Sequence, residues 1–193
     1  MLFRSLPAAA AEARTAARYF ERADVRVRGE ASEAFLKRTP LAGYRILHFA
    51  THAIVDGRAL TRTALALAPG DGEDGFVTPG DLAALELDAD LVVLSACQTA
   101  GGVVVSGEGI QGLTAPLLEA GARAVVATQW RIGDRGAGPL LEGFYRALAA
   151  GLAAGDALRL AKREAIGRGA PPSEWAAFVL VGDPMVRVPL RAP

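Results

Sequence analysis

The sequence has little cysteine, no excess of charge of one sign and no long apolar run. It contains 1 Cys among 193 residues, so it forms no internal disulfide and no zinc site built from several cysteines. The 21 Lys and Arg residues balance 21 Asp and Glu residues, which argues against a nucleic-acid protein that binds through bulk positive charge. No apolar run reaches the roughly 18–20 residues that a membrane span requires. We therefore expect a cytoplasmic protein that binds neither nucleic acid nor membrane.

The composition favours a folded domain and argues against a disordered chain. Hydrophobic residues make up 51% of the chain, enough to bury a sizeable core. A length of 193 residues fits one domain, because domains average about 150 residues. No segment of 20–50 residues repeats, which excludes a solenoid.

Short apolar strands alternate with helical segments along most of the chain. We expect strands at residues 24–28, 45–50, 64–68, 91–95, 124–128 and 177–181, and helices at residues 8–22, 32–38, 110–120, 137–150 and 154–167. Ser32 and Thr78 are the expected N-caps of two helices, and residues 53–62 and 98–108 are expected loops. This alternation predicts an α/β fold: a three-layer α/β/α sandwich with a mostly parallel sheet and helices on both faces.

Residues with side chains suited to catalysis follow two of the expected strands. Thr51 and His52 come after the strand at 45–50, and Cys97 comes after the strand at 91–95. The carboxyl ends of parallel strands meet at one edge of a sheet, so Cys97 and His52 are expected close together. A thiol beside an imidazole is the arrangement of a nucleophilic cysteine site. The non-catalytic alternatives are that Cys97 is a buried structural residue and that His52 caps an element or faces solvent. His48 lies inside its strand and is expected to pack in the core.

Two other motifs compete with this interpretation. His48 and His52 are four residues apart, as in a helical zinc site, but Phe49 stands where that motif needs Glu, and the segment reads as a strand. Residues 107–112 have the spacing Gly-x-Gly-x-x-Gly of a dinucleotide-binding turn. However, Glu108 would face the pyrophosphate, and the strand at 124–128 is not followed by a carboxylate for the ribose. We therefore expect neither a metal nor a cofactor.

Several motifs in order make the sequence resemble a known family. These are HFATH at 48–52, DLVVLSACQT at 90–99, GEG at 107–109, TQW at 128–130, WAAF at 175–178 and GDP at 182–184. Together they resemble the CHAT domain, which is similar to caspases, separases and gingipains. The resemblance covers about residues 6–186 and implies a single caspase-like domain over residues 1–193. The family usually has a further strand before the Leu-Pro pair that is Leu6 and Pro7 here. We expect that strand to be absent, either because it is dispensable or because the chain is a piece of something longer.

The resemblance implies roles for individual residues. Cys97 would be the nucleophile of a cysteine endopeptidase and His52 its dyad partner. The backbone N–H groups of Cys97 and Ala53 would form the oxyanion hole, where the family pattern usually has Gly at the second position.

The resemblance also implies substrate contacts, because in the related peptidases the residues after the cysteine strand and after the next strand shape the S1 pocket; here these are Gln98, Glu108, Trp130 and Asp134. The carboxylates of Glu108 and Asp134 would suit a basic P1 side chain. The structural alternatives to substrate binding are that Glu108 and Asp134 cap helices and that Trp130 belongs to the core.

Two functions of different class remain open from the sequence. The first is a cysteine endopeptidase acting on a protein substrate through a Cys97–His52 dyad. The second is a caspase-like binding or regulatory module with little or no turnover, which the Ala at position 53 favours. Because CHAT domains are often attached to TPR repeats or other sensor modules, the expected partner is a regulatory or TPR-type sensor protein.

Overall fold

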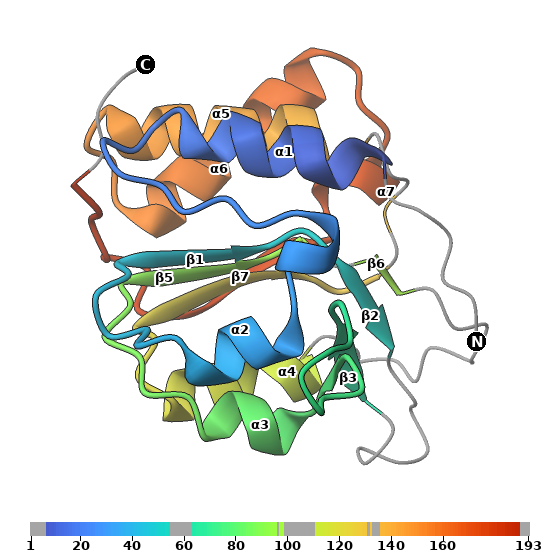
Figure 1. The fold of residues 1–193 in the computed structure, drawn as a ribbon. Coiled ribbons are helices and arrows are strands. Elements are labelled where there is room, and N and C mark those ends of the chain that lie inside the picture. Colours follow the sequence, from blue (N-terminus) through green and yellow to red (C-terminus); the bar gives the residue numbers. More distant parts are fainter. Residues whose placement is uncertain are drawn as a thin grey trace.

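Two four-stranded β-sheets form the framework of the protein (Figure 1). The structure is a computed structural model that describes residues 7–54, 63–95, 97–98, 111–130, 132 and 136–189. The larger sheet has the strand order β1-β5-β7-β8, and the smaller sheet has the order β4-β3-β2-β6. The strands are β1 (Ile46–Phe49), β2 (His52–Ile54), β3 (Ala64–Ala66), β4 (Phe76–Val77), β5 (Leu91–Leu94), β6 (Cys97–Gln98), β7 (Ala124–Thr128) and β8 (Phe178–Gly182).

The helices lie on both faces of the larger sheet (Figure 1). One face is covered by α1 (Pro7–Ala17), α5 (Ala137–Ala149), α6 (Ala154–Gly167) and α7 (Pro172–Trp175), and the other by α2 (Glu33–Arg38), α3 (Pro79–Ala83) and α4 (Gln111–Glu119). A short 3-10 helix, η1, spans Arg28–Glu30. This arrangement confirms the expected α/β fold with three layers. Among the described residues, no helix combines the length and apolar character of a membrane span.

All of β5 and the first four residues of β7 are apolar because both faces of the sheet are covered. All four residues of β5 are fully buried. Leu91 and Val93 belong to the core beneath α1, α5 and α6, whereas Val92 and Leu94 belong to the core on the opposite face. Alternate side chains of a strand point to opposite faces, so one continuous apolar run fills both cores.

Three strands of the larger sheet are parallel, and the last one is antiparallel. β1 and β5 pair in parallel, as do β5 and β7, but β8 runs antiparallel to β7. A single crossover helix returns the chain to the starting end of the sheet and gives a parallel strand. After β7 the chain instead makes two long helices, α5 and α6, which pack against each other. The second helix brings the chain back to the end where β7 finished, so β8 runs the other way.

Local sequence signals fix several element ends. The Ser32 hydroxyl accepts a hydrogen bond of 3.1 Å from the Phe35 N–H and caps α2. Thr78 and Asp81 form a capping box at the start of α3, with Pro79 in the first turn. These caps confirm the sequence expectations for both helices.

Two sequence expectations about strands are wrong. Residues 24–28 form no strand: residues 24–27 have no regular secondary structure and pair with no strand of the described chain. The backbone turns at Arg28, whose φ is 55°, and η1 begins there. The short strands β2 and β6 lie partly in segments expected to be loops, because two or three residues carry too little hydrophobic pattern to identify a strand.

Candidate active site

β2 and β6 continue the chain from two neighbouring strands of the larger sheet. In that sheet β1 and β5 pair in parallel, and their last partners are Phe49 and Leu94. Three residues after each of these positions, His52 and Cys97 are partners in the parallel pair β2–β6. The segments that follow β1 and β5 therefore leave the larger sheet at the same end, and each reaches the smaller sheet after the same number of residues. The residue pairing of β1 with β5 thus continues in the pairing of β2 with β6.

His52 occupies the middle of a row of three paired backbone positions. It pairs with Cys97 of β6 on one side and with Ala66 of β3 on the other. Neighbouring strands lie about 4.8 Å apart, so the backbones of His52 and Cys97 are as close as two separate segments of a sheet can be. The His52 residue is 8% exposed.

The residues on either side of His52 are held by the smaller sheet. The Thr51 hydroxyl donates a hydrogen bond to the Ala66 carbonyl. Ala53 exposes no surface and pairs with Leu65 of β3 and Gln98 of β6. Sequence reasoning missed Thr51, whose only signal was its position directly before the candidate histidine.

A groove of about 560 Å³ leads along β1 to the candidate site. Its floor includes β1 and the following residues as far as His52. Its walls include alanines of α1, residues 24 and 26–28, and parts of α2 and β3. On one wall the Arg26 guanidinium lies 4.6 Å from the centre of the Phe35 ring. The same guanidinium donates bonds of 2.7 and 3.0 Å to Asp24, and these bonds hold the pKa of that carboxyl below its ordinary value. A mostly apolar groove with a few polar groups is typical of a binding cleft.

His48 has a different role from His52, because both of its ring nitrogens are engaged. Nδ1 lies 2.7 Å from the Tyr145 hydroxyl and Nε2 lies 2.8 Å from a Glu12 carboxylate oxygen. Burial, with a smaller contribution from Glu12, raises the pKa of Tyr145, so its hydroxyl keeps its proton. Both ring nitrogens of His48 are thus paired, one with a hydroxyl and the other with a carboxylate. His48 thus connects α1, β1 and α5 by a buried polar chain instead of packing as an apolar core residue.

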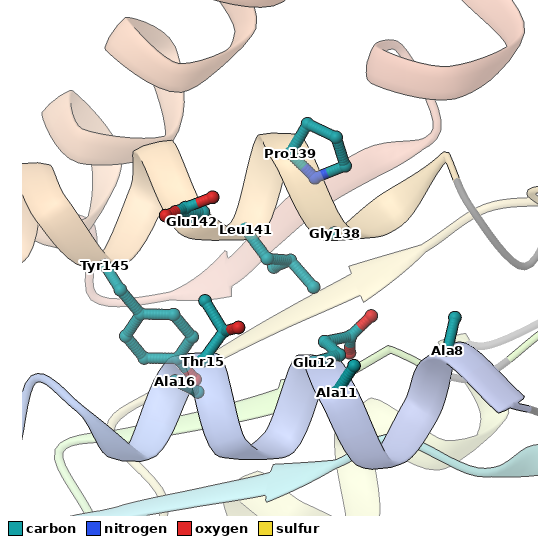
Figure 2. A pocket seen from close by; sticks show the side chains of 10 residues that line it. All are labelled: Ala8, Ala11, Glu12, Thr15, Ala16, Gly138, Pro139, Leu141, Glu142 and Tyr145. Atoms are coloured by element: carbon teal, nitrogen blue, oxygen red, sulfur yellow. The ribbon is translucent and has the colours of Figure 1, made fainter.

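This polar chain lies beside a pocket of about 300 Å³ between α1 and α5 (Figure 2). Glu12 and Thr15 point from α1 toward α5, and Leu141 and Tyr145 point from α5 toward α1. The described residues contain no group of three or more His, Cys, Asp or Glu side chains able to hold a metal ion.

The structure describes two of the four residues that were expected to contact substrate. Trp130 follows β7, is 37% exposed, and donates a bond of 2.9 Å from its indole N–H to the Ser173 carbonyl of α7. Gln98 lies in β6 opposite Ala53. Glu108 and Asp134, like the GEG motif at 107–109, lie outside the described residues, so their roles stay predictions.

Comparisons with known proteins agree with the motifs. Residues 1–183 match the CHAT domain. Tetratricopeptide repeat protein 28 of Mus musculus is 36% identical over 110 residues, which is 56% of this chain and 4% of that protein. Its counterpart in Homo sapiens is 33% identical over the same length and covers the same shares. The chain therefore spans only a small part of these curated relatives. Because the family match extends over nearly the whole sequence, the chain belongs to the CHAT domain family.

Proposed function

We propose that this chain is a cysteine endopeptidase that cleaves protein substrates through Cys97 and His52. The observation that carries the proposal is the register of the smaller sheet, in which His52 and Cys97 are direct partners although they lie 45 positions apart in sequence. They are the single cysteine of the chain and one of its 2 histidines. Membership of the CHAT domain family, which is similar to caspases, supports the same chemistry.

The first half of the reaction forms an acyl-enzyme. His52 takes the proton of the Cys97 thiol, and the resulting thiolate attacks the carbonyl carbon of the scissile peptide bond. Backbone N–H groups of Cys97 and Ala53 are proposed to stabilise the negative carbonyl oxygen of the tetrahedral intermediate. The C–N bond then breaks, the imidazolium of His52 gives its proton to the leaving amine, and a thioester remains on Cys97.

The second half regenerates the enzyme. A water molecule loses a proton to His52 and attacks the thioester carbonyl. The C–S bond breaks, the carboxylic acid product leaves, and the proton returns from His52 to the Cys97 thiolate. His52 thus acts in turn as base and as acid, the two roles that an imidazole fills in catalysis.

The surroundings of the dyad support an extended polypeptide as substrate. The groove along β1 ends at Thr51 and His52, and its length of seven residues from Ile46 to His52 corresponds to about 23 Å of extended chain. Trp130, fixed to Ser173, offers a half-exposed aromatic surface for a substrate side chain. The carboxylates of Glu108 and Asp134 remain our proposed source of a preference for Arg or Lys at P1.

The test is cleavage of a peptide library varied at P1, analysed by mass spectrometry. The wild-type chain should cleave after Arg or Lys, and Cys97→Ala and His52→Ala should abolish cleavage while circular dichroism shows an unchanged fold. Activity that survives Cys97→Ala would refute the nucleophile assignment. Cleavage after Asp with none after Arg or Lys would refute only the basic P1 preference.

A specific observation favours a second function, that of a binding or regulatory module with little turnover. Ala53, the proposed second donor of the oxyanion hole, is fully buried between β3 and β6, whereas a donor must be accessible to substrate. The relatives are tetratricopeptide repeat proteins, which suits a TPR-type regulatory partner. Under this function, Cys97→Ala leaves the affinity for such a partner unchanged and no library peptide is cleaved.

A further inference from the structure

The backbone pairing that sets His52 opposite Cys97 is very short. β2 pairs with β6 over two residue pairs and with β3 over three. A slip of one residue turns every side chain of a strand to the opposite face. In this sheet such a slip would bring Ala53 opposite Cys97 and turn His52 away, so the dyad depends on what prevents β2 from shifting.

A side-chain hydrogen bond supplements that pairing at the point where the chain enters β2. Thr51 lies between the two sheets, after β1 and directly before His52, and its hydroxyl donates to the carbonyl of Ala66. Ala66 is the register partner of His52. The bond therefore ties the residue before His52 to the strand position opposite His52, and a shifted β2 cannot keep it.

We infer that Thr51 is a positioning residue for the proposed dyad: its hydroxyl fixes the register of β2 on β3 and so holds His52 opposite Cys97. This inference rests on the proposed function. Thr51 touches no reacting atom in this role, since it acts only through the placement of His52. Its contribution is to the coupling between imidazole and thiol, apart from any contribution to stability.

The chain contains a matched control for this inference. Thr63 stands immediately before β3, is 1% exposed, and its hydroxyl forms no hydrogen bond with the described part of the chain. Thr63→Val and Thr51→Val make the same chemical change at residues that directly precede two neighbouring strands of the smaller sheet, β3 and β2. Both retain a β-branched side chain that suits a strand, but only the change at Thr51 removes a bond next to His52.

The experiment measures the pH dependence of Cys97 alkylation by iodoacetamide, which needs no turnover. An isolated thiol has a pKa of about 8.5, and coupling to His52 should lower the apparent value in the wild-type chain. We expect His52→Ala to remove that lowering and Thr51→Val, or Thr51→Ala as a second variant, to remove at least half of it. Thr51→Ser, which keeps the hydroxyl, and Thr63→Val should both retain the wild-type profile. Circular dichroism and urea unfolding establish that the compared proteins are folded.

The two proposals fail in different ways in this experiment. If His52→Ala raises the apparent thiol pKa but both hydroxyl-deleting variants at Thr51 keep the wild-type value, the inference about Thr51 is overturned and the dyad stands. An equal shift in Thr51→Ser would overturn it as well. If His52→Ala leaves the profile unchanged, the dyad itself is wrong and the role of Thr51 falls with it.

Discussion

Replacing Lys37 by Met should destabilise the protein by about 2–3 kcal/mol at neutral pH. Lys37 of α2 forms ion pairs with Glu33, Glu73 and Asp81 at 2.6, 3.0 and 2.9 Å, and so ties α2 to the loop at 69–75 and to α3. The Glu33 side chain is only 3% exposed. Removing one partner of a fully buried ion pair costs about 3–5 kcal/mol. We expect less here because 27% of the Lys37 side chain is exposed and solvent screens part of the interaction.

The pH dependence of this loss follows from the pKa of Asp81. Although burial acts to raise that pKa, hydrogen bonds from Thr78 and Lys37 outweigh it and hold the value below the ordinary one. A carboxyl with a lowered pKa adds stability above its unfolded pKa of about 3.9 and loses it as the pH falls through the folded value. The difference in unfolding free energy between wild type and Lys37→Met should thus be full at pH 7 and shrink below about pH 4.

Urea unfolding at a series of pH values from about 3 to 8 measures this difference, with the linear extrapolation giving each free energy. Lys162→Met is the matched control. Lys162 is the only other lysine, and burial alone lowers its pKa, so its loss should not destabilise the protein. The reasoning would be refuted if Lys37→Met lowers the free energy of unfolding by less than about 0.5 kcal/mol. It would also be refuted if this loss of stability grows as the pH falls.

Two further predictions concern buried contacts. Tyr145→Phe removes the hydroxyl that bonds to His48, and we expect a loss of about 2 kcal/mol by urea unfolding, since a mostly buried ring nitrogen loses its partner; a loss below about 0.5 kcal/mol would contradict the polar chain. Gly121→Ala should cost at least about 2–3 kcal/mol, because Gly121 has φ +112° and an added Cβ would lie 2.1 Å from the Leu87 carbonyl oxygen. Its control, Gly138→Ala, adds a Cβ in open space on α5 and should stabilise the protein by about 0.5–1 kcal/mol. Equal losses for the two glycine variants would contradict this reasoning.

The sequence predicted the large elements well because their signals are local and repeated. The apolar run at 91–95 and the helical pattern at 154–167 correspond closely to β5 and α6. The helix caps at Ser32 and Thr78 were predictable for the same reason, since the capping side chain lies beside the N–H group that it accepts from.

Features that depend on distant contacts could not be predicted in this way. Residues 24–28 alternate like a strand, yet they pair with no strand among the described residues, and strand formation requires a partner edge. The direction of β8 depends on how α5 and α6 fold back on each other.

The candidate site shows the same division. The approach of His52 and Cys97 to one edge followed from the positions of the strand ends. The exact partner register arose from the equal three-residue steps out of β1 and β5, which the sequence pattern did not reveal. The hydrogen bond from Thr51 to Ala66 joins residues 15 positions apart, and no local sequence pattern predicts it.

The central claim is that the fold brings positions 52 and 97 together, and a disulfide measures this directly. Because neighbouring strands are about 4.8 Å apart and disulfides join Cα atoms about 4.4–6.8 Å apart, His52→Cys should form an intramolecular bond with Cys97 under mild oxidation. In the control Ile54→Cys, two residues further along β2, the separation grows to about 8 Å, too long for a disulfide. The account predicts rapid loss of both free thiols in the first variant only. Persistent free thiols in His52→Cys, or equal oxidation of the two variants, would contradict it.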